Sequence, residues 1–382
     1  MIALAGLLIG GAGGCSPREQ VVTGAESGQT DSPAAAWSEM KIDHTMKLLY
    51  ADQLSVDYYD GGYALITIES GGRHLVVPEH GKIPLGMPDD VTVIRKPLQN
   101  IYLAATSAMD LFRSLDGMER ITLSGTDASG WYIEEARQAV EDGRMLYAGK
   151  YNAPDYELIL SKSCDLAIES TMIYHTPEVK EQLEKLGVPV LVERSSYEKN
   201  PLGRMEWMKL YGVLLDKEEL ADSSFDEEME KLRPVLNQEH TDKTVAFFYV
   251  SSNGYVNVRK PWDYVSRMIH MAGGTYLPQD LPDNENALST MNMQMEAFYG
   301  AVKDADYLIY NSTIDGELDS LDGLLAKSGL LAGFKAVKEG HVWCTERNMF
   351  QETMGLGDMI LDIHKILTEE EPEGLRYMHR LR

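Results

Sequence analysis

The chain of 382 residues contains little cysteine and little positive charge. Three cysteines are too few for a disulfide scaffold, so the fold has to rest on a hydrophobic core. Lysine and arginine number 35 against 60 aspartates and glutamates, and the formal net charge is −25. A field of this sign repels nucleic acids and anionic lipid headgroups. The two shortages argue against a disulfide-stapled domain and against a nucleic-acid-binding protein.

Signatures of catalysis and of metal binding are also missing. The sequence has no Walker phosphate loop, no three-glycine dinucleotide fingerprint between a strand and a helix, and no Gly-x-Ser-x-Gly elbow. The nine histidines are scattered, and the nearest approach to a ligand spacing, His341 with Cys344, has no further partner nearby. We therefore expect neither an enzyme, nor a metal site, nor a cofactor.

Long apolar runs are absent except at the N-terminus, where an apolar stretch ends at Cys15. The stretch is shorter than the roughly 20 residues that span a bilayer, but it suits the apolar region of a signal peptide. With Cys15 it resembles a bacterial lipoprotein signal, and that resemblance implies a lipid on Cys15. The alternative is a trimmed conventional signal peptide, and both alternatives predict export. Residues 16–36 are small and polar, which predicts a disordered tether.

The remainder has an ordinary globular composition, with 44% hydrophobic and 25% charged residues. Its length suits about two lobes of 100–200 residues. Residues 37–91 contain short β-type runs, including expected strands at 46–50 and 63–68, separated by glycine pairs such as Gly61-Gly62. Glycine pairs between such runs indicate hairpins. We predict a β-rich extension here.

The rest of the chain alternates strand and helix patterns. Alternation occurs over 92–216 and over 241–382, and it includes an expected helix at 291–302. Between these stretches, residues 217–240 carry one long charged helix pattern with a single apolar side. Alternating strands and helices produce parallel sheets covered by helices. The predicted fold class is α/β, with two Rossmann-like lobes joined by a single long α-helix and preceded by a β-hairpin-rich extension.

Several fragments, taken in order, carry a resemblance to a known family. They are Leu98 to Ser107, Pro154-Asp-Tyr-Glu-Leu-Ile-Leu160, Cys164-Asp-Leu-Ala-Ile168, Leu186-Gly-Val-Pro-Val190, Ala272-Gly-Gly274 and Asp304-Ala-Asp-Tyr-Leu-Ile309. In order and spacing they resemble the substrate-binding proteins of ABC importers for iron–siderophore, haem and cobalamin. Two features depart from that pattern: Cys164 stands where the family usually has proline, and the β-rich extension exceeds the core family.

The resemblance implies a clamshell that holds its ligand between the lobes and delivers it to a membrane permease and its ATPase. The implied cargo is a ferric siderophore or haem first, and a corrinoid second. The protein would then be extracytoplasmic and anchored to the membrane by its lipid, at the cell surface or in the periplasm. Two other classes stay open: a secreted α/β enzyme and a ligand-sensing module, each using the same cleft.

Ligands of open α/β sheets bind beyond the carboxyl ends of the strands. Loops expected there are rich in arginine and aromatic residues, which supply bidentate donors and stacking faces. Arg204 and Arg259 are the strongest candidates, and Tyr174 or His175 could ligate haem iron axially. In the alternative reading, Asn200 caps a helix that places Trp207 in the core. The predicted ligand-binding residues are Arg204, Trp207, Tyr197, Tyr255, Arg259, Trp262, Tyr174, His175 and Arg347.

The resemblance also implies two permease-docking carboxylates, one on each lobe. Glu157 and Glu296 match the family's positions. Exposed carboxylates of this kind steer docking and fix its register. The alternative is that Glu157 is an acid favoured by a helix dipole and that Glu296 lies on a solvated helix face.

Overall fold

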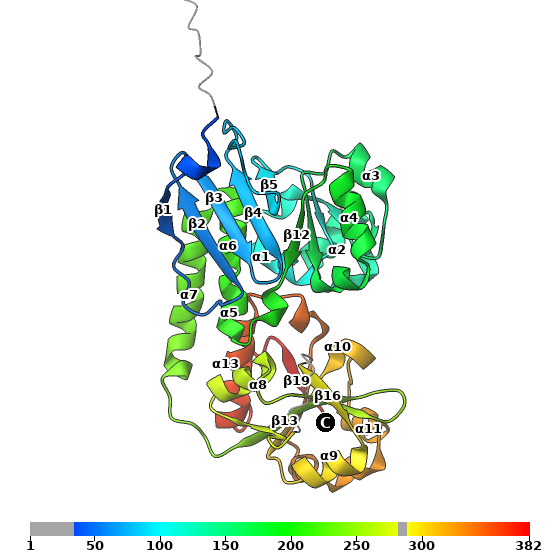
Figure 1. Cartoon of the computed structure of the whole chain (residues 1–382). Helices are drawn as coiled ribbons and strands as arrows, with labels where there is room; N and C mark the ends of the chain where they lie inside the picture. Colours follow the sequence, from blue (N-terminus) through cyan, green and yellow to red (C-terminus); the bar gives the residue numbers. More distant parts are fainter. Residues whose placement is uncertain (1–33, 282–288) are drawn as a thin grey trace, which may run out of the picture. The chain divides into compact units, whose positions relative to one another are not determined.

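The computed structural model describes residues 34–281 and 289–382. The predicted signal peptide, Cys15 and most of the predicted tether lie outside the described residues. Residues 35–382 form one compact unit (Figure 1). Within the described ranges, no helix has the length and apolar character needed to cross a membrane.

The N-terminal sheet has five strands in the order β1-β2-β3-β4-β5. The strands pair antiparallel, apart from the parallel pair β4–β5. Gly61 and Gly62, both at φ +82°, form the tight turn between β2 and β3, where a left-handed backbone suits glycine. The strands are β1 (Ile42–Thr45), β2 (Leu54–Tyr59), β3 (Tyr63–Ile68), β4 (Gly72–Val77) and β5 (Val91–Arg95).

One predicted strand of this region is wrong. The first strand covers Ile42–Thr45, whereas the sequence pattern placed it at residues 46–50. The reason is a long-range contact: the backbone N–H groups of Leu49, Tyr50 and Ala51 donate to the carboxylate of Glu206, at 2.8–3.0 Å. These amides therefore have a side-chain acceptor in place of a neighbouring strand.

The first α/β sheet is parallel throughout, with the order β12-β11-β6-β7-β8. Strands alternate with helices along the chain, as the pattern predicted. The strands are β6 (Ile101–Leu103), β7 (Ile121–Ser124), β8 (Leu146–Tyr147), β11 (Leu166–Ser170) and β12 (Val190–Glu193), with the small hairpin β9 (Gly149–Lys150) and β10 (Ala153–Pro154) beside them. The helices are α1 (Met109–Ser114), α2 (Glu134–Glu141), α3 (Tyr156–Ser161) and α4 (Pro177–Lys185).

The second sheet is mixed, with the order β16-β14-β13-β17-β18-β19 and with β15 also paired to β13. Its strands are β13 (Thr244–Val250), β14 (Val256–Arg259), β15 (Thr275–Leu277), β16 (Thr290–Met293), β17 (Tyr307–Tyr310), β18 (Val342–Thr345) and β19 (Met378–Arg380). Its helices are α8 (Tyr264–Met271), α9 (Met295–Val302), α10 (Ser312–Asp315), α11 (Leu321–Leu325) and α12 (Lys335–Glu339).

Two local expectations fail in this sheet. The helix expected over 291–302 begins only at Met295, because the preceding residues pair with β14 as strand β16. Arg259, expected in a loop, is the last residue of β14. Strand β16 pairs with a segment more than thirty residues away, which a local pattern does not reveal, whereas β14 also pairs with the neighbouring β13.

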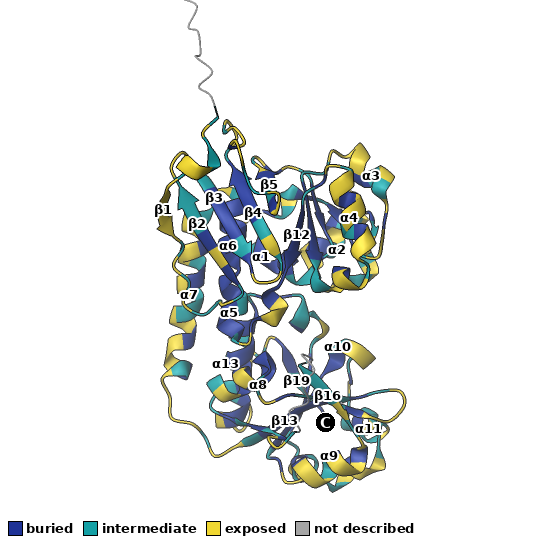
Figure 2. Ribbon diagram, viewed as in Figure 1, coloured by how far each residue is buried: buried dark blue, intermediate teal, exposed yellow. Residues whose placement is uncertain are grey.

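Four helices pack against one another between the first α/β sheet and the second sheet. They are α5 (Pro201–Glu206), α6 (Met208–Leu215), α7 (Glu218–Leu236) and the C-terminal α13 (Leu356–Thr368), which packs against α5, α7 and α8. Figure 2 shows α6 almost wholly buried, whereas α7 keeps an exposed face. One hydrophobic cluster contains Ile101 of β6, Phe225 of α7 and Val245 of β13. Both sheets therefore share a core through these helices.

Short 3-10 turns complete the described structure. They are η1 (Trp37–Glu39), η2 (Thr106–Ala108), η3 (Met118–Arg120), η4 (Ala128–Gly130), η5 (Thr171–His175), η6 (Ser195–Tyr197), η7 (Gly329–Gly333) and η8 (Arg347–Phe350). Several of them follow the carboxyl ends of strands, where binding residues are expected.

Candidate functional site

Two adjoining cavities, of about 460 and about 370 Å³, lie where the segment after β12 meets residues of the second sheet. We call them together the arginine cleft. Ser196, Arg204, Tyr264 and Ser289 line both cavities. The remaining lining residues are Tyr197, Glu198, Lys199, Tyr249, Asn257, Arg259, Trp262, Asp263, Asn311, Thr290, Thr313, Ile314 and Phe350. Their combined volume is in the range of small-molecule sites.

Arg204 is the central cation of the arginine cleft. Its helix, α5, begins at Pro201 after Asn200, whose side chain accepts the N–H of Leu202 at 3.0 Å. The guanidinium carbon lies 3.4 Å from the centroid of the Tyr264 ring, so the two planar groups are in contact. Its Nε donates to the carbonyl of Glu198 at 3.1 Å, and Nη2 donates to another carbonyl. Burial lowers the pKa of Arg204, although a guanidinium stays protonated in proteins.

Arg259 enters the same cleft from β14. Its Nη1 lies 3.8 Å from Oδ2 of Asp263, and its guanidinium carbon lies 5.8 Å from the centroid of Tyr264. Asp263 caps α8 by accepting the N–H of Val265 at 2.9 Å. Burial raises the pKa of Asp263, and Arg259 opposes that rise. One capping carboxylate thus faces two guanidinium groups, of Arg204 and Arg259.

The other acidic residue of the arginine cleft is already bonded. Glu198 accepts the N–H groups of Asp52 and Gln53, and it accepts Nε1–H of Trp207 at 2.9 Å. Among the described residues, no carboxylate forms an ion pair with Arg204. Among the described lining residues, three cations therefore stand against two carboxylates, in a protein whose net charge is strongly negative.

Aromatic rings stand beside these cations. Tyr197 is 45% exposed, and its ring centroid lies 4.2 Å from the guanidinium carbon of Arg194. The Trp262 ring lies between the ammonium groups of Lys199 and Lys260, at 5.9 and 5.4 Å. Partly exposed rings flanked by cations can stack on a flat, anionic ligand.

The structure gathers four of the nine predicted ligand-binding residues in one place. Tyr197, Arg204, Arg259 and Trp262 all line the arginine cleft. Trp207 is fully buried among the helices and lines neither cavity. This position agrees with the alternative prediction, in which Asn200 caps a helix that places Trp207 in the core. We therefore leave it out of the proposed site.

The other four predicted residues lie outside the lining of the cleft. Tyr255 is exposed in the turn before β14. Tyr174 and His175 are exposed on η5, and the hydroxyl of Tyr174 donates to the carbonyl of Ser70 at 2.9 Å. Arg347 is exposed, with Nε 3.6 Å from Glu317 and the guanidinium carbon 6.0 Å from the Tyr132 ring.

Sequence reasoning missed Tyr264, which touches Arg204, and Asp263, which pairs with Arg259. A local signal was present. Asp263 is a favoured helix-capping residue at the start of an apolar helical pattern. The sequence could therefore have predicted that Asp263 and Tyr264 stand at the start of a helix, beside the expected site. The contact of Tyr264 with Arg204 was not predictable locally, since sixty residues separate the two.

Other predicted residues have clear positions. Glu157 and Glu296 are exposed in the first turns of α3 and α9. Cys164 is partly buried and Cys344 is buried, and both are free. In the described part of the chain, no group of three or more histidine, cysteine, aspartate or glutamate residues is arranged to hold a metal ion.

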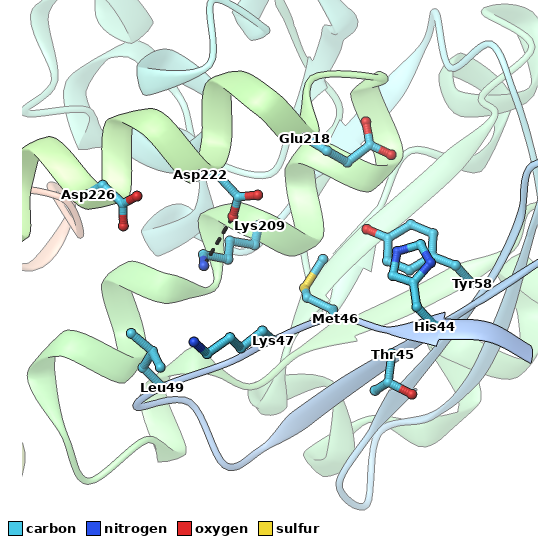
Figure 3. A pocket seen from close by; sticks show the side chains of 10 residues that line it. All are labelled: His44, Thr45, Met46, Lys47, Leu49, Tyr58, Lys209, Glu218, Asp222 and Asp226. Atoms are coloured by element: carbon cyan, nitrogen blue, oxygen red, sulfur yellow. Dashed lines mark ion pairs between the residues drawn. The ribbon is translucent and has the colours of Figure 1, made fainter.

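A larger cavity, of about 600 Å³, lies elsewhere, between β1 and the helices α6 and α7 (Figure 3). Three carboxylates line its helix side, from Glu218, Asp222 and Asp226. Lys209 reaches Asp222 at 3.1 Å, and His44 stacks on Tyr58 with centroids 4.4 Å apart. None of the predicted ligand-binding residues lines this cavity.

Two lobes, one built on a parallel sheet and one on a mixed sheet, with a cleft beside their strand ends, define a two-lobed α/β fold. The family model for the periplasmic binding protein matches residues 122–347, more than half of the chain. The chain belongs to the periplasmic binding protein family.

Comparison with individual proteins finds low sequence identity to this chain. An uncharacterized lipoprotein of Methanocaldococcus jannaschii is 25% identical over 363 residues, which cover 88% of this chain and 83% of that protein. A periplasmic heme binding protein from Pseudomonas aeruginosa has a TM-score of 0.57 at 16% identity, covering 74% of this chain and 98% of that one. The periplasmic catecholate-siderophore binding protein VctP of Vibrio cholerae has a TM-score of 0.56 at 14% identity, covering 71% and 94%. At these identities the structures show a shared fold.

Proposed function

We propose that the protein is the extracytoplasmic solute-binding lipoprotein of an ABC importer. It captures an anionic metal chelate in the arginine cleft, without turnover, and passes the chelate to the permease. Ferric siderophores and haem are the leading cargo, and corrinoids come second. The metal belongs to the cargo, and the protein contributes a pocket of cations and aromatic rings.

The observation that carries this proposal is the stack of Arg204 on Tyr264 with Arg259 nearby. The Asp263 carboxylate lies 3.8 Å from Arg259, whereas Arg204 has no ion pair with a described carboxylate, although the buried Glu193 and Asp263 both act on its charge. Bringing a further anion between the two guanidinium groups completes charge-assisted hydrogen bonds in a desolvated place, where such bonds are strongest. Haem propionates, siderophore catecholates and carboxylates all supply such anions.

The names of similar proteins support the same class of cargo. One structural neighbour is a heme binding protein and another is a catecholate-siderophore binding protein. Both ligands are broad and partly flat, and Tyr197 and Trp262 offer ring faces of matching character.

The location and the partners form part of the proposal. The relative from Methanocaldococcus jannaschii is named as a lipoprotein, and Cys15 is the residue of this chain that would carry the lipid. The exposed Glu157 and Glu296 would meet basic residues of the permease. Carboxylates that steer docking are expected on the surface, where these two lie.

The test is a ligand panel on the chain from residue 16 onward, with haem, several ferric siderophores, cobalamin and free metal ions. A ligand at about 100 times its dissociation constant adds roughly 2.7 kcal/mol, which moves the unfolding midpoint by a few degrees. One strong hit among the chelates supports the proposal and names the cargo. A shift with free metal alone, or with no compound of the panel, contradicts it.

A further inference from the structure

A third cavity, of about 530 Å³, lies along one side of helix α8, with lining residues from Pro261, just before the helix, to His270 in its last turn, and it shares no described lining residue with the arginine cleft. Tyr264 begins α8 at the cleft, and His270 stands in the last turn of the helix. Six residues separate them, which is about 9 Å along a helix axis. His270, His240, Arg267, Thr275 and Gln279 line this cavity, which we call the histidine cavity.

Two imidazole rings face each other in the histidine cavity. The ring centroids of His240 and His270 are 4.1 Å apart, with their planes tilted by 40°. The loop that carries His240 is fixed to the end of α8, because Thr241 donates both its N–H and its hydroxyl to the carbonyl of Gly273, at 2.8 and 2.7 Å. The pair is therefore held together by the fold.

The side chains free to bind a ligand in this cavity are donors or become donors on protonation. The described residues that line it include no carboxylate. Arg267 is exposed and forms no ion pair with a described residue. The hydroxyls of Ser266 and Tyr276 already donate to the carbonyls of Lys260 and Arg259. What remains is a guanidinium, the Thr275 hydroxyl, an amide and two imidazoles, and the charge among them is positive only, so the group favours an anion once the imidazoles are protonated.

We propose that the histidine cavity is a second ligand site, which binds an oxyanion group between Arg267, His240 and His270 with the histidines protonated. Its ligand class is a small molecule that bears a sulfate, phosphate or carboxylate group. The site is separate from the arginine cleft, and its test does not depend on the cargo.

Proton uptake accompanies binding at this site. Burial and the neighbouring positive charges of His240 and Arg267 lower the pKa of His270. The loop of His240 also carries Glu239 and Asp242, and α13 contributes His364, whose Nδ1 contacts the carbonyl of Ala272 at 3.1 Å. An anion beside the two adjacent rings, accepting hydrogen bonds from their N–H groups, offsets the repulsion between two protonated imidazoles, so binding strengthens as the pH falls through the range where histidine titrates.

Sulfate is the first probe, because its own charge is constant across this pH range, and citrate is the second, as a carboxylate. Binding is followed by isothermal titration and by the imidazole proton signals in NMR spectra. We expect the affinity for at least one probe to be about tenfold or more higher near pH 5.5 than near pH 8, as protonation of a histidine requires. Binding of citrate alone assigns the site to carboxylates.

Variants locate the site. His240→Gln and His270→Gln should each remove most of the pH dependence, and Arg267→Ala should weaken binding at every pH. His80→Gln is the matched control, because His80 is an exposed histidine of the N-terminal extension. The proposal is overturned if neither probe binds, or if the His240→Gln, His270→Gln double variant binds with the affinity and pH dependence of the parent protein.

Discussion

The arginine cleft and the cavity of Figure 3 both contain cations on neighbouring helices, but they compensate the charges differently. Lys209 of α6, beside the Figure 3 cavity, lies 3.1 Å from Asp222 and 3.6 Å from Glu206. Arg204 of α5 contacts carbonyl oxygens and the ring of Tyr264, without a carboxylate partner in the described structure. A cation with internal partners serves the fold, whereas a cation without them has capacity left for a ligand.

The largest expected effect concerns Glu206, which is one of the two carboxylate partners of Lys209. Glu206 is fully buried, accepts the N–H groups of Leu49, Tyr50 and Ala51, and faces Lys209. Glu206→Gln removes the charge and turns an acceptor into a donor against these amides. We expect a loss of about 3–5 kcal/mol of unfolding free energy, as for breaking a buried pair, measured by chemical denaturation.

Glu219→Gln is the control for this change, because Glu219 is an exposed residue of α7. Surface substitutions of this kind change stability by about 0.5 kcal/mol or less. Equal stability of the two variants would show that the Glu206 carboxylate does not hold the extension to the helices.

A carboxylate without a hydrogen-bond partner among the described residues sharpens the comparison. Glu169 of β11 is buried, neither of its oxygens bonds to a described residue, and burial raises its pKa to about 8. The folded protein therefore holds a proton on Glu169 that the unfolded chain releases above its ordinary pKa of about 4.5. Stability contributed by this group falls as the pH rises from there to about 8, and then levels off.

Glu169→Gln should therefore raise the unfolding free energy by about 4 kcal/mol near pH 8 and leave it nearly unchanged near pH 4.5. Denaturation curves at several pH values measure the difference. Glu157→Gln, at an exposed glutamate, should show no such slope. A parallel pH dependence in Glu169→Gln and the parent protein would argue against a protonated Glu169.

The role of Arg204, which has no carboxylate partner in the described structure, is tested by ligand binding. Arg204→Ala should weaken binding of the chelate identified in the ligand panel by about 2 kcal/mol, or roughly thirtyfold, since a charged hydrogen bond and a stacked face are lost. Arg204→Lys keeps the charge but loses the planar stack on Tyr264. Its affinity for the chelate should therefore lie between those of the parent protein and Arg204→Ala. Circular dichroism checks that both variants fold.

Lys209→Met provides the contrast, because it removes a cation of the compensated side. It should lower stability and leave the dissociation constant of the chelate unchanged. If Lys209→Met weakens chelate binding as much as Arg204→Ala does, the presence or absence of an ion pair does not distinguish a structural cation from a ligand-binding one.

The smallest effect is expected on the surface. Glu157→Ala and Glu296→Ala should leave chelate affinity unchanged and slow delivery to the permease a few-fold, because rim charges act mainly on association rates. Uptake in cells and transfer in reconstituted membranes measure it. Glu181→Ala, an exposed charge of α4 outside the proposed docking pair, is the control. Equal slowing by all three variants would remove Glu157 and Glu296 as specific contacts.

The α/β class and the two-lobed fold were predicted from the sequence and are confirmed, because hydrophobic periodicity and strand–helix alternation are local properties. Strand β3 was predicted with the bounds Tyr63–Ile68 that the structure has. Strand β16 was missed because its partner β14 is remote in sequence, and β14 was missed although it also forms a hairpin with the neighbouring β13. Pairing of this kind depends on the folded context more than on residue preference.

The binding residues divide in a similar way. Arg204 and Arg259 stood out as arginines among aromatic residues, and the structure places both in one cleft. Their assignment as ligand contacts stays a prediction. Trp207 carried the same local signal, yet it is buried, since helical phase and the packing of α5 decide which side a residue faces.

The hydrogen bonds between the extension and helix α5 also limit how this chain can be shortened. Glu198 and Glu206 both accept backbone amides from residues 49–53, and both are buried. A chain that began after β5 would lose these donors to both acids. Buried acids without donors take up protons or unfold their surroundings. Relatives that dispense with the extension should therefore carry other residue types at these two positions, and a shortened chain would need the same replacements to fold.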